Sequence, residues 1–408
     1  MSPAGPANSI RRPPPLWLAV AAVASGWSAV FSIGRWVARY LQDPLDIDFR
    51  LYYFAARLGI EQGWNRIYDQ AALKALVAAQ FSGAAAVVDS SHTFPNPPLL
   101  AWIIAPLTSL PYGPAYAAWT LAGVLCLLFA WWVACPYQGV ARLTLLCVAV
   151  AIWPIHYSFV LGQPTPEVLA LVAGGWWLLR RARPLEAGLA LAVATALKPQ
   201  DVILVPFVLL FAGHGRLFLS WGVGCAVLAA LFVASLGWSG LGDFWHTTLE
   251  VESDSSHHIW TLASVAGPGL PGRVLEVAAV IGALLVAWRH RDSPELVIAI
   301  GLAGSVLSAV HEHETDATML VLAAWLVLRS PAGGWARLWL LPGIACAQAM
   351  SIGLVPPIFV WEIGWLALLA ADRARGARNP ASQTLAATAG ANPTSPPAFS
   401  TRLRGCWR

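Results

Sequence analysis

The chain has 408 residues, of which 58% are hydrophobic and only 11% are charged. Soluble domains carry roughly 25% charged residues, so this composition excludes an ordinary soluble protein and indicates a membrane protein. The net charge of +4 comes almost wholly from arginine, and its distribution gives no support to a nucleic-acid-binding function.

Apolar runs long enough to cross a bilayer recur between residues 16 and 371. They lack the alternating pattern of barrel strands, so the spanning elements are predicted to be helices. We predict an all-α polytopic membrane protein with about twelve transmembrane helices. Residues 1–15 form a cytoplasmic N-terminus in this prediction, 16–371 the transmembrane domain, and 372–408 a disordered cytoplasmic tail rich in Ala, Thr, Pro and Ser.

The positions of the arginines predict the orientation. The first span, 16–34, begins after Arg11 and Arg12, which should keep that end in the cytoplasm, although Arg35 and Arg39 at its far end oppose this. The segment 99–110 is short and bounded by prolines, so it is predicted not to cross on its own. Later basic residues then fall on the inner side of a cell membrane, among them Arg142, Arg180, Arg216, Arg289, Arg329 and Arg373.

Polar residues are predicted to gather on the outer face in five stretches: 42–69, 162–165, 198–201, 243–260 and 311–316. In the first stretch, 51–58 and 71–81 are predicted to form short amphipathic helices at the membrane interface. The stretch 243–260 is predicted to be a wide loop.

The first stretch contains the strongest candidate for a catalytic group. Asp48 precedes a predicted helical turn that carries Arg50, Tyr52 and Tyr53. A carboxylate at a water-accessible membrane edge can deprotonate an alcohol during group transfer, although loops between spans are often simply polar. Because Asp46 is only two residues away, a helix would point the two carboxylates in different directions, and only one is expected to face a site.

Lys198 is one of two lysines and lies beside an apolar run. A buried ammonium is costly unless it is paired or reaches the interface, so a snorkelling lysine is one interpretation. On the outer side it would break the positive-inside trend, which favours an anionic partner such as a lipid phosphate.

Two further polar motifs leave structural alternatives open. Gly162 and Gln163 are also compatible with a simple helix start. His311 and His313 alternate with acidic residues, but this pattern is a weak metal motif, and hydrogen bonding to phosphate or sugar hydroxyls is the simpler hypothesis. No metal site is predicted.

The ordered set of short motifs resembles glycosyltransferase family 87, which consists of GT-C type membrane glycosyltransferases and includes mannosyltransferases that use polyprenyl-phosphate-mannose. The motifs that carry the resemblance are Asp48-Phe49 with Tyr52-Tyr53, Pro97-Pro98, Gly162-Gln163, Lys198-Pro199 and the segment from His311 to Asp316.

The resemblance implies a GT-C type bundle and a hexosyltransferase, with mannose as the expected sugar. The sugar would move from a polyprenyl-phosphate-sugar to a hydroxyl of a glycolipid or glycan on the extracytoplasmic face, with inversion and without a cofactor. Asp48 would be the base, and the stretch 243–260 would belong to acceptor binding. The residues expected to contact the donor phosphate or sugar are Tyr52, Arg66, Gln163, Lys198, His311 and His313.

Two other functions fit the composition. A transporter or lipid flippase also has many spans and few intramembrane charges, but it usually places them near the bilayer midplane, whereas here they are predicted at one face. A non-catalytic scaffold subunit would keep the fold without the chemistry.

Overall fold

The computed structural model describes residues 15–42, 46–81, 93–253, 259–267 and 269–376. These residues form α-helices and short 3-10 turns, with no strand among them, so the all-helical prediction is confirmed. The predicted N-terminal segment and nearly all of the predicted tail lie outside the described residues. The last helix, α20 (Pro356–Gly376), continues past the predicted domain end at residue 371.

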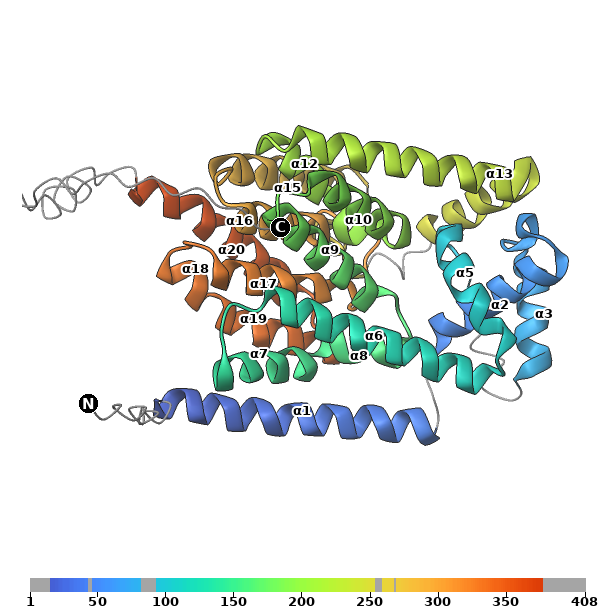
Figure 1. The fold of residues 1–408 in the computed structure, drawn as a ribbon, viewed down its shortest axis with the longest axis horizontal. Helices are drawn as coiled ribbons and strands as arrows, with labels where there is room; N and C mark the ends of the chain where they lie inside the picture. Colours follow the sequence, from blue (N-terminus) through green and yellow to red (C-terminus); the bar gives the residue numbers. More distant parts are fainter. Residues whose placement is uncertain (1–14, 43–45, 82–92, 254–258, 268, 377–408) are drawn as a thin grey trace, which may run out of the picture.

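The core of the bundle consists of apolar helices without a polar face. α16 (Pro294–Leu307) is buried from Glu295 to its end, as expected for a helix that is hydrophobic on all sides. It packs against α17 (Met319–Arg329), α12 (Leu204–Phe211) and α15 (Leu270–Arg289). α6 (Tyr112–Ala134), α9 (Thr165–Arg180) and α10 (Pro184–Leu197) form the neighbouring part of the bundle (Figure 1).

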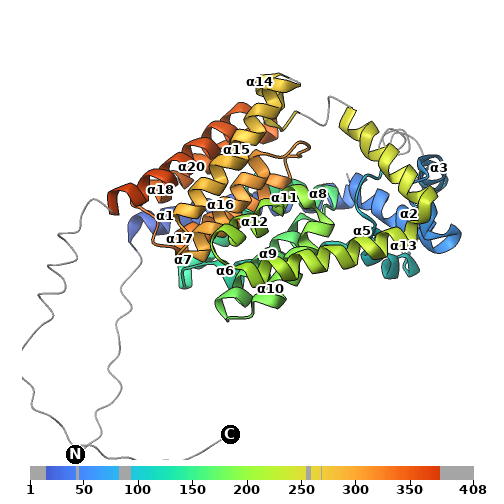
Figure 2. The ribbon, with the colours of Figure 1, turned by 90° about the horizontal axis from the view of Figure 1, so that it is seen from above.

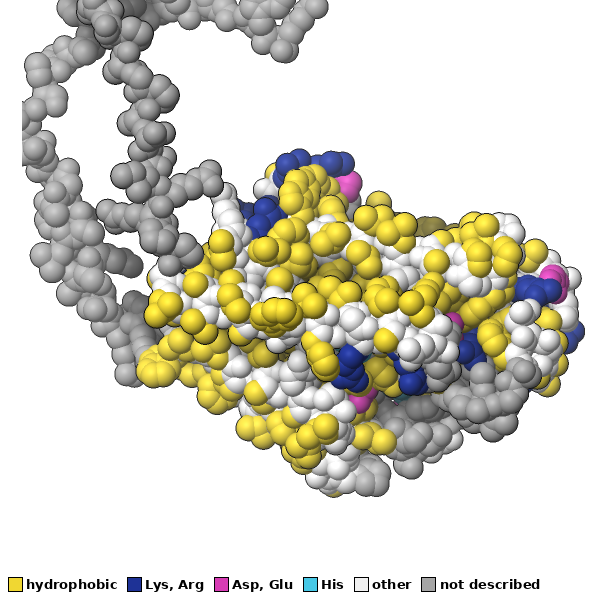
Figure 3. All heavy atoms as spheres, turned by 90° about the horizontal axis from the view of Figure 1, so that it is seen from below, with side chains coloured by type: hydrophobic (Ala, Val, Ile, Leu, Met, Phe, Trp, Pro, Cys, Tyr) yellow, Lys and Arg dark blue, Asp and Glu magenta, His cyan; other side chains and the backbone are white. Residues whose placement is uncertain are grey.

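Two long helices lie on opposite flanks of this core (Figure 1). α1 (Leu16–Gln42) packs along α7 (Gly139–Ala151) and contacts α8 (Trp153–Leu161), while α13 (Gly215–Ser253) packs along α10. Exposed apolar side chains such as Trp17, Val23 and Trp27 cover α1, as expected for a helix that faces lipid. Figure 3 shows a mostly hydrophobic surface with small groups of charged side chains.

Within the described residues, α1, α6, α13 and α15 are each long and apolar enough to cross a membrane. α7 and α8 are bent by 57° relative to each other and would form a fifth span if they are counted together. Shorter apolar helices, including α10 and α16, fill the bundle between them. The number of about twelve crossings stays a prediction.

A helical cap covers one end of the bundle (Figure 2). It contains α2 (Ile47–Gln62), η1 (Trp64–Arg66), α3 (Gln70–Gln80), α5 (Pro98–Ile104) and η2 (Ala105–Ser109). The helix predicted at 51–58 is part of α2, but it has no amphipathic pattern of burial, because α3, α5 and η2 pack around α2 and bury most of it. Its aromatic and aliphatic residues leave no continuous polar face for water.

The prediction of a wide loop at 243–260 is wrong for residues 243–253, which continue α13. The 39 residues of α13 correspond to about 58 Å of helix, well beyond the roughly 30 Å of hydrocarbon. The helix breaks at Gly237 (φ 59°, ψ −173°), and the part after this break reaches the cap. There Gln70 Nε2 donates to Thr247 Oγ1 at 3.4 Å.

The remaining described elements are short or lie at the end of the chain near α20. They are α11 (Pro199–Val202), α14 (Leu262–Ala266), η4 (Asp316–Thr318), α18 (Gly334–Leu338), α19 (Leu340–Ala349) and η5 (Met350–Ile352).

Arg329 and Arg180 lie at the end of the bundle away from the cap. Arg329, at the end of α17, donates to the carbonyl oxygen of Cys135 at 2.9 Å, just after α6 ends. Arg180, at the end of α9, pairs with Glu295 at 3.6 Å. α9 and α17 begin at Thr165 and Met319. The polar stretches 162–165 and 311–316, which precede these two residues, therefore lie at the other end of the same helices.

Candidate active site

Asp48 lies in the first turn of α2 and is half-buried. Its Oδ2 accepts a hydrogen bond from Gln163 Nε2 at 2.6 Å, although the two residues are 115 positions apart. Asp46 is fully buried and faces other partners, because its Oδ1 pairs with Arg50 Nη2 at 2.7 Å and its Oδ2 accepts from the Tyr112 hydroxyl at 2.7 Å. The two carboxylates therefore point in different directions, as their spacing predicts.

Gly162 brings Gln163 to Asp48. It ends α8 in the left-handed conformation with φ 75°, which a glycine adopts without steric cost. A Cβ atom at this position would lie 2.6 Å from Phe49 Cβ, the neighbour of Asp48. Trp119 Nε1 donates to the Gly162 carbonyl at 2.9 Å and fixes the turn. α9 begins at Thr165, so the Gly-Gln motif is the tight connection between two helices.

Lys198 follows the last residue of α10 and is 2% exposed. Its ammonium donates to Thr165 Oγ1 at 3.1 Å, to Thr315 Oγ1 at 3.3 Å and to Asp316 Oδ1. Since an ammonium has three N–H donors, each of them has an acceptor here. The interpretation of a snorkelling lysine is wrong, because burial is compensated by an internal ion pair.

The segment from His311 to Asp316 connects α16 to η4. Asp316 Oδ2 accepts from the His313 backbone N–H at 3.0 Å, and the rings of His311 and His313 are 4.9 Å apart. Burial raises the pKa of Glu312 well above its ordinary value, with a further contribution from Glu362, and burial raises the pKa of Glu314 to about 7. The segment is thus partly internal, unlike a solvated loop. No group of three or more His, Cys, Asp or Glu among the described residues is placed to hold a metal ion.

Tyr52 lies one turn after Asp48 on α2. It is 2% exposed, and burial raises the pKa of its hydroxyl well above the ordinary value. The charges of Asp48, Asp316 and Glu167 raise this pKa further, which places Tyr52 within electrostatic range of both clusters. At neutral pH its hydroxyl keeps its proton.

The structure does not bring Arg66 into these clusters. Arg66 follows the far end of α2, which is roughly 20 Å long from Asp48 onward. Its side chain is 46% exposed and pairs with Asp69 at 2.5 Å, the residue that caps α3. The carboxylate that pairs with Arg66 therefore belongs to the cap and not to the clusters around Asp48 and Lys198.

Several residues of the site were not singled out from the sequence as binding groups. Thr165 and Thr315 are both fully buried and contact Lys198, but uncharged hydroxyls next to apolar runs give no distinctive signal. Asp201 lies 4.0 Å from the Lys198 ammonium, and its spacing of three residues within Lys-Pro-Gln-Asp could have indicated this pair.

Together these features define a helical membrane protein with a polar site buried at the capped end of its bundle. The model of glycosyltransferase family 87 matches residues 94–331, more than half of the chain. The chain therefore belongs to glycosyltransferase family 87, as its motifs predict, and it is a membrane glycosyltransferase. Comparison with curated proteins and with solved structures found no match.

The matched residues contain part of the candidate site. Gln163, Lys198, His311 and His313 lie within them, whereas Asp48 precedes them. The hydrogen bond from Gln163 to Asp48 is thus a direct contact between the matched region and the cap helix α2.

Proposed function

We propose that this glycosyltransferase moves a hexose, with mannose as the expected sugar, from a polyprenyl-phosphate-sugar to an acceptor hydroxyl on the extracytoplasmic face. The observation that carries the proposal is the hydrogen bond between Asp48 and Gln163 at the capped end of the bundle. This contact joins a half-buried carboxylate of the cap to the end of the helix bundle, which supports a site at the membrane surface.

Asp48 is the general base in this proposal. It takes the proton of the acceptor hydroxyl while the hydroxyl oxygen forms a bond to the anomeric carbon of the sugar. The bond between that carbon and the phosphate oxygen breaks, and the lipid phosphate leaves with the bonding electrons. A single displacement of this kind inverts the anomeric centre and requires no cofactor. The amide of Gln163 orients the carboxylate.

Lys198 is a positioning residue in this proposal. Each of its donors already has an acceptor, so direct contact with a phosphate would require the exchange of one of them. Its ion pair with Asp316 instead fixes the start of η4 and the preceding histidine segment. His311, His313 and the protonated hydroxyl of Tyr52 are the groups proposed to bind the sugar.

The distribution of charge supports an extracytoplasmic site. Arg180 and Arg329 lie at the end of the bundle opposite Asp48, and basic residues favour the cytoplasmic side. The cap, including the second half of α13, then faces the outside and is proposed to bind the glycolipid or glycan acceptor. The alternative of a transporter or flippase gains no support from the family match.

The test is transfer of labelled sugar from a polyprenyl-phosphate-sugar by the purified protein in liposomes. Asp48→Asn should reduce the transfer rate by at least about 10²-fold, because the base is lost. Glu61→Gln is the matched control on α2, since Glu61 is exposed and its carboxylate pairs with Arg57 at 2.6 Å, away from Asp48. This control should retain wild-type transfer.

Both variants should have the thermal unfolding midpoint of the parent protein within a few degrees. Wild-type transfer by a folded Asp48→Asn variant would remove Asp48 from the mechanism. Uptake of a solute into the same liposomes without sugar transfer would favour the transporter.

A further inference from the structure

A small internal space of about 10 Å³ lies beside Gln163, between α6, α8 and the start of α9. Gln163, Glu167, Thr120 and Ser158 give its lining polar atoms. This volume is about the minimum that holds one water molecule. The space is therefore suited to a bound water and is too small for a sugar or a lipid.

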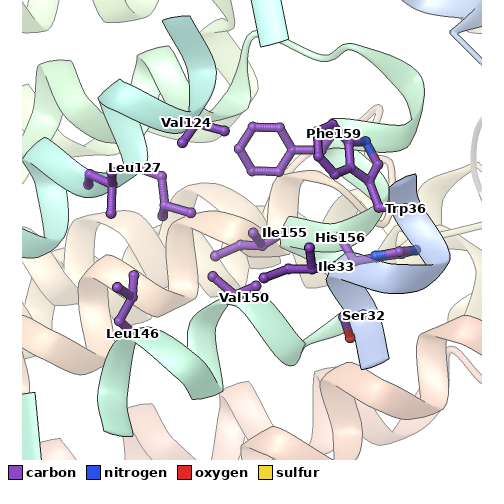
Figure 4. A pocket seen from close by; sticks show the side chains of 11 residues that line it. Ser32, Ile33, Trp36, Val124, Leu127, Leu146, Val150, Ile155, His156 and Phe159 are labelled. Atoms are coloured by element: carbon purple, nitrogen blue, oxygen red, sulfur yellow. The ribbon is translucent and has the colours of Figure 1, made fainter. Parts of the chain in front are cut away.

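A larger cavity of about 360 Å³ lies next to it, between α1, α6, α7 and α8 (Figure 4), and Phe159 lines both. Leucine, isoleucine and valine side chains make up most of the larger wall, and the hydroxyl of Ser32 in it already donates to the Ala151 carbonyl at 3.3 Å. Internal water binds where two to four polar groups converge. The small space beside Gln163 offers such groups, whereas the larger cavity is mostly apolar.

Two residues of the small space have buried oxygen atoms that call for a donor. Gln163 is 7% exposed, and its Nε2 donates to Asp48, but its Oε1 accepts no hydrogen bond from a described residue. Both carboxyl oxygens of Glu167 are buried as well, and neither forms a hydrogen bond with another described residue. Since a buried polar atom without a partner is costly, a donor between these two side chains is expected.

Glu167 does not have the usual role of a glutamate at a helix start. It is the third residue of α9, and a side chain at this position often accepts from the backbone N–H of the residue before the helix. That residue is Pro164, which has no N–H. Glu186, at the same position of α10, is exposed instead and accepts from Arg183 at 2.9 Å.

Gly123 of α6 makes room for the Glu167 carboxyl group. A Cβ atom added at Gly123 would lie 3.3 Å from Glu167 Oε1 and 3.1 Å from Phe159 Cε1, which is closer than ordinary contact. All three residues line the small space. Glu167 Oε1 therefore lies at the wall of this space, and a side chain at Gly123 would take up part of its volume.

We propose that Glu167 is a positioning residue that, through one water molecule bound in this space, holds the Gln163 amide with its Nε2 toward Asp48. The water donates one hydrogen bond to Gln163 Oε1 and the other to the Glu167 carboxyl group. If the amide turned over, its Oε1 would face the Asp48 carboxylate, acceptor against acceptor. A donor at Oε1 thus favours the orientation that supports the base. This inference rests on the proposed function and adds a residue to it.

The test measures kcat and the KM of a polyprenyl-phosphate-sugar for variants in liposomes. Glu167→Met keeps a side chain of similar length without the carboxyl oxygens, and it should lower kcat about tenfold at an unchanged KM, because the base loses its orientation. Glu167→Gln keeps an oxygen that accepts from the water and should stay within about twofold of the parent. Glu186→Met is the matched control at the same helix position and should retain the parent kcat.

Two further comparisons separate this role from a loss of packing. Gly123→Ala should lower kcat at least about threefold, because it crowds the water. Gly174→Ala on α9 should not, since its Cβ would meet the Phe129 ring at an ordinary 3.6 Å. In a Gln163→Ala background, Glu167→Met should cause no further loss. A Glu167→Gln variant as slow as Glu167→Met, or losses that multiply in the double variant, would overturn the inference.

Thermal unfolding of the same variants separates this inference from the proposed function, because it needs no substrate. Glu167→Met should lower the unfolding midpoint by a few degrees more in the parent than in the Gln163→Ala background, since only the parent has an Oε1 that loses its donor. This coupling, together with no sugar transfer by the parent, would count against the proposed function alone. Transfer that depends on Asp48 but is unchanged in Glu167→Met would count against the positioning role alone.

Discussion

Gly162 determines the position of Gln163, because both its backbone conformation and its packing exclude a side chain. Its φ is 75°, and an added Cβ would lie 2.6 Å from Phe49 Cβ and 3.3 Å from the Tyr116 ring. Any shift that relieves these contacts moves either the turn that carries Gln163 or the first turn of α2 that carries Asp48. The geometry of the Asp48 site therefore depends on a residue without a side chain.

Gly162→Ala should reduce sugar transfer by at least about tenfold, because displacement of a catalytic group by about 1 Å is enough to cost more than this. Gly139→Ala is the matched control, since Gly139 also has a positive φ of 59° but has no atom within 4 Å of an added Cβ. Both variants bear backbone strain of about 1–2 kcal/mol, so their difference in transfer rate reports the clash. Equal transfer rates in the two variants would contradict this role for Gly162.

The sequence predicts which residues are polar and rare, but it does not predict their partners. Asp48, Gln163 and Lys198 stand out because few polar groups interrupt the apolar runs. The partner of Lys198 is Asp316, 118 positions away, and only the packing of α10 against the bundle brings them together. The hydroxyl of Thr165 can be recognised as a hydrogen-bond acceptor for Lys198 only once this packing is known.

At the level of elements, α13 has two parts with different surroundings. Before the break at Gly237 it follows α10 along the flank, and after it the helix packs against η1 in the cap. The close approach occurs at Gly240, where an added Cβ would lie 2.8 Å from the Asn65 carbonyl oxygen. This contact connects the bundle to the cap on the side opposite α1.

Gly240→Ala should lower the free energy of unfolding by about 1–3 kcal/mol, because backbone atoms of η1 cannot move aside as a flexible side chain would. Gly242→Ala, two residues further along the same helix, meets no atom within 4 Å and should be neutral or stabilising by about 0.5–1 kcal/mol. Thermal unfolding in one detergent compares the two. A Gly240→Ala variant as stable as Gly242→Ala would show that the contact is not tight.

The sequence predicts the apolar elements better than the polar ones. The apolar runs 115–134, 274–288 and 318–328 of the sequence coincide closely with α6, α15 and α17, because proline and arginine residues near the ends of such runs mark helix limits. Residues 243–253 are polar yet helical, and α2 is rich in charges yet buried. In both cases the cap supplies the packing, which polarity along the chain does not reveal.

On the scale of the whole molecule, the two ends of the bundle differ in chemistry. One end has the cap and Asp48, and the other has Arg180, Arg329 and their carbonyl and carboxylate partners. A bilayer between these ends would leave the candidate site at one interface. The proposed orientation puts the cap outside the cell.

An impermeant maleimide applied to intact cells measures this orientation. Glu61→Cys, in the cap, should be labelled in intact cells, whereas Arg183→Cys, at the basic end, should be labelled only after permeabilisation, because Arg clusters favour the inner side. The unsubstituted protein gives the background from its own cysteines. Labelling of Arg183→Cys but not Glu61→Cys in intact cells would reverse the orientation.

The central claim, that Asp48 and Gln163 act as one catalytic unit, is tested most directly by a double-mutant cycle on sugar transfer in liposomes. Asp48→Asn should reduce transfer by at least about 10²-fold and Gln163→Ala by about tenfold, while the double variant should be no slower than Asp48→Asn alone. Independent, multiplying losses, or parent-level transfer by a folded Asp48→Asn variant, would contradict the claim.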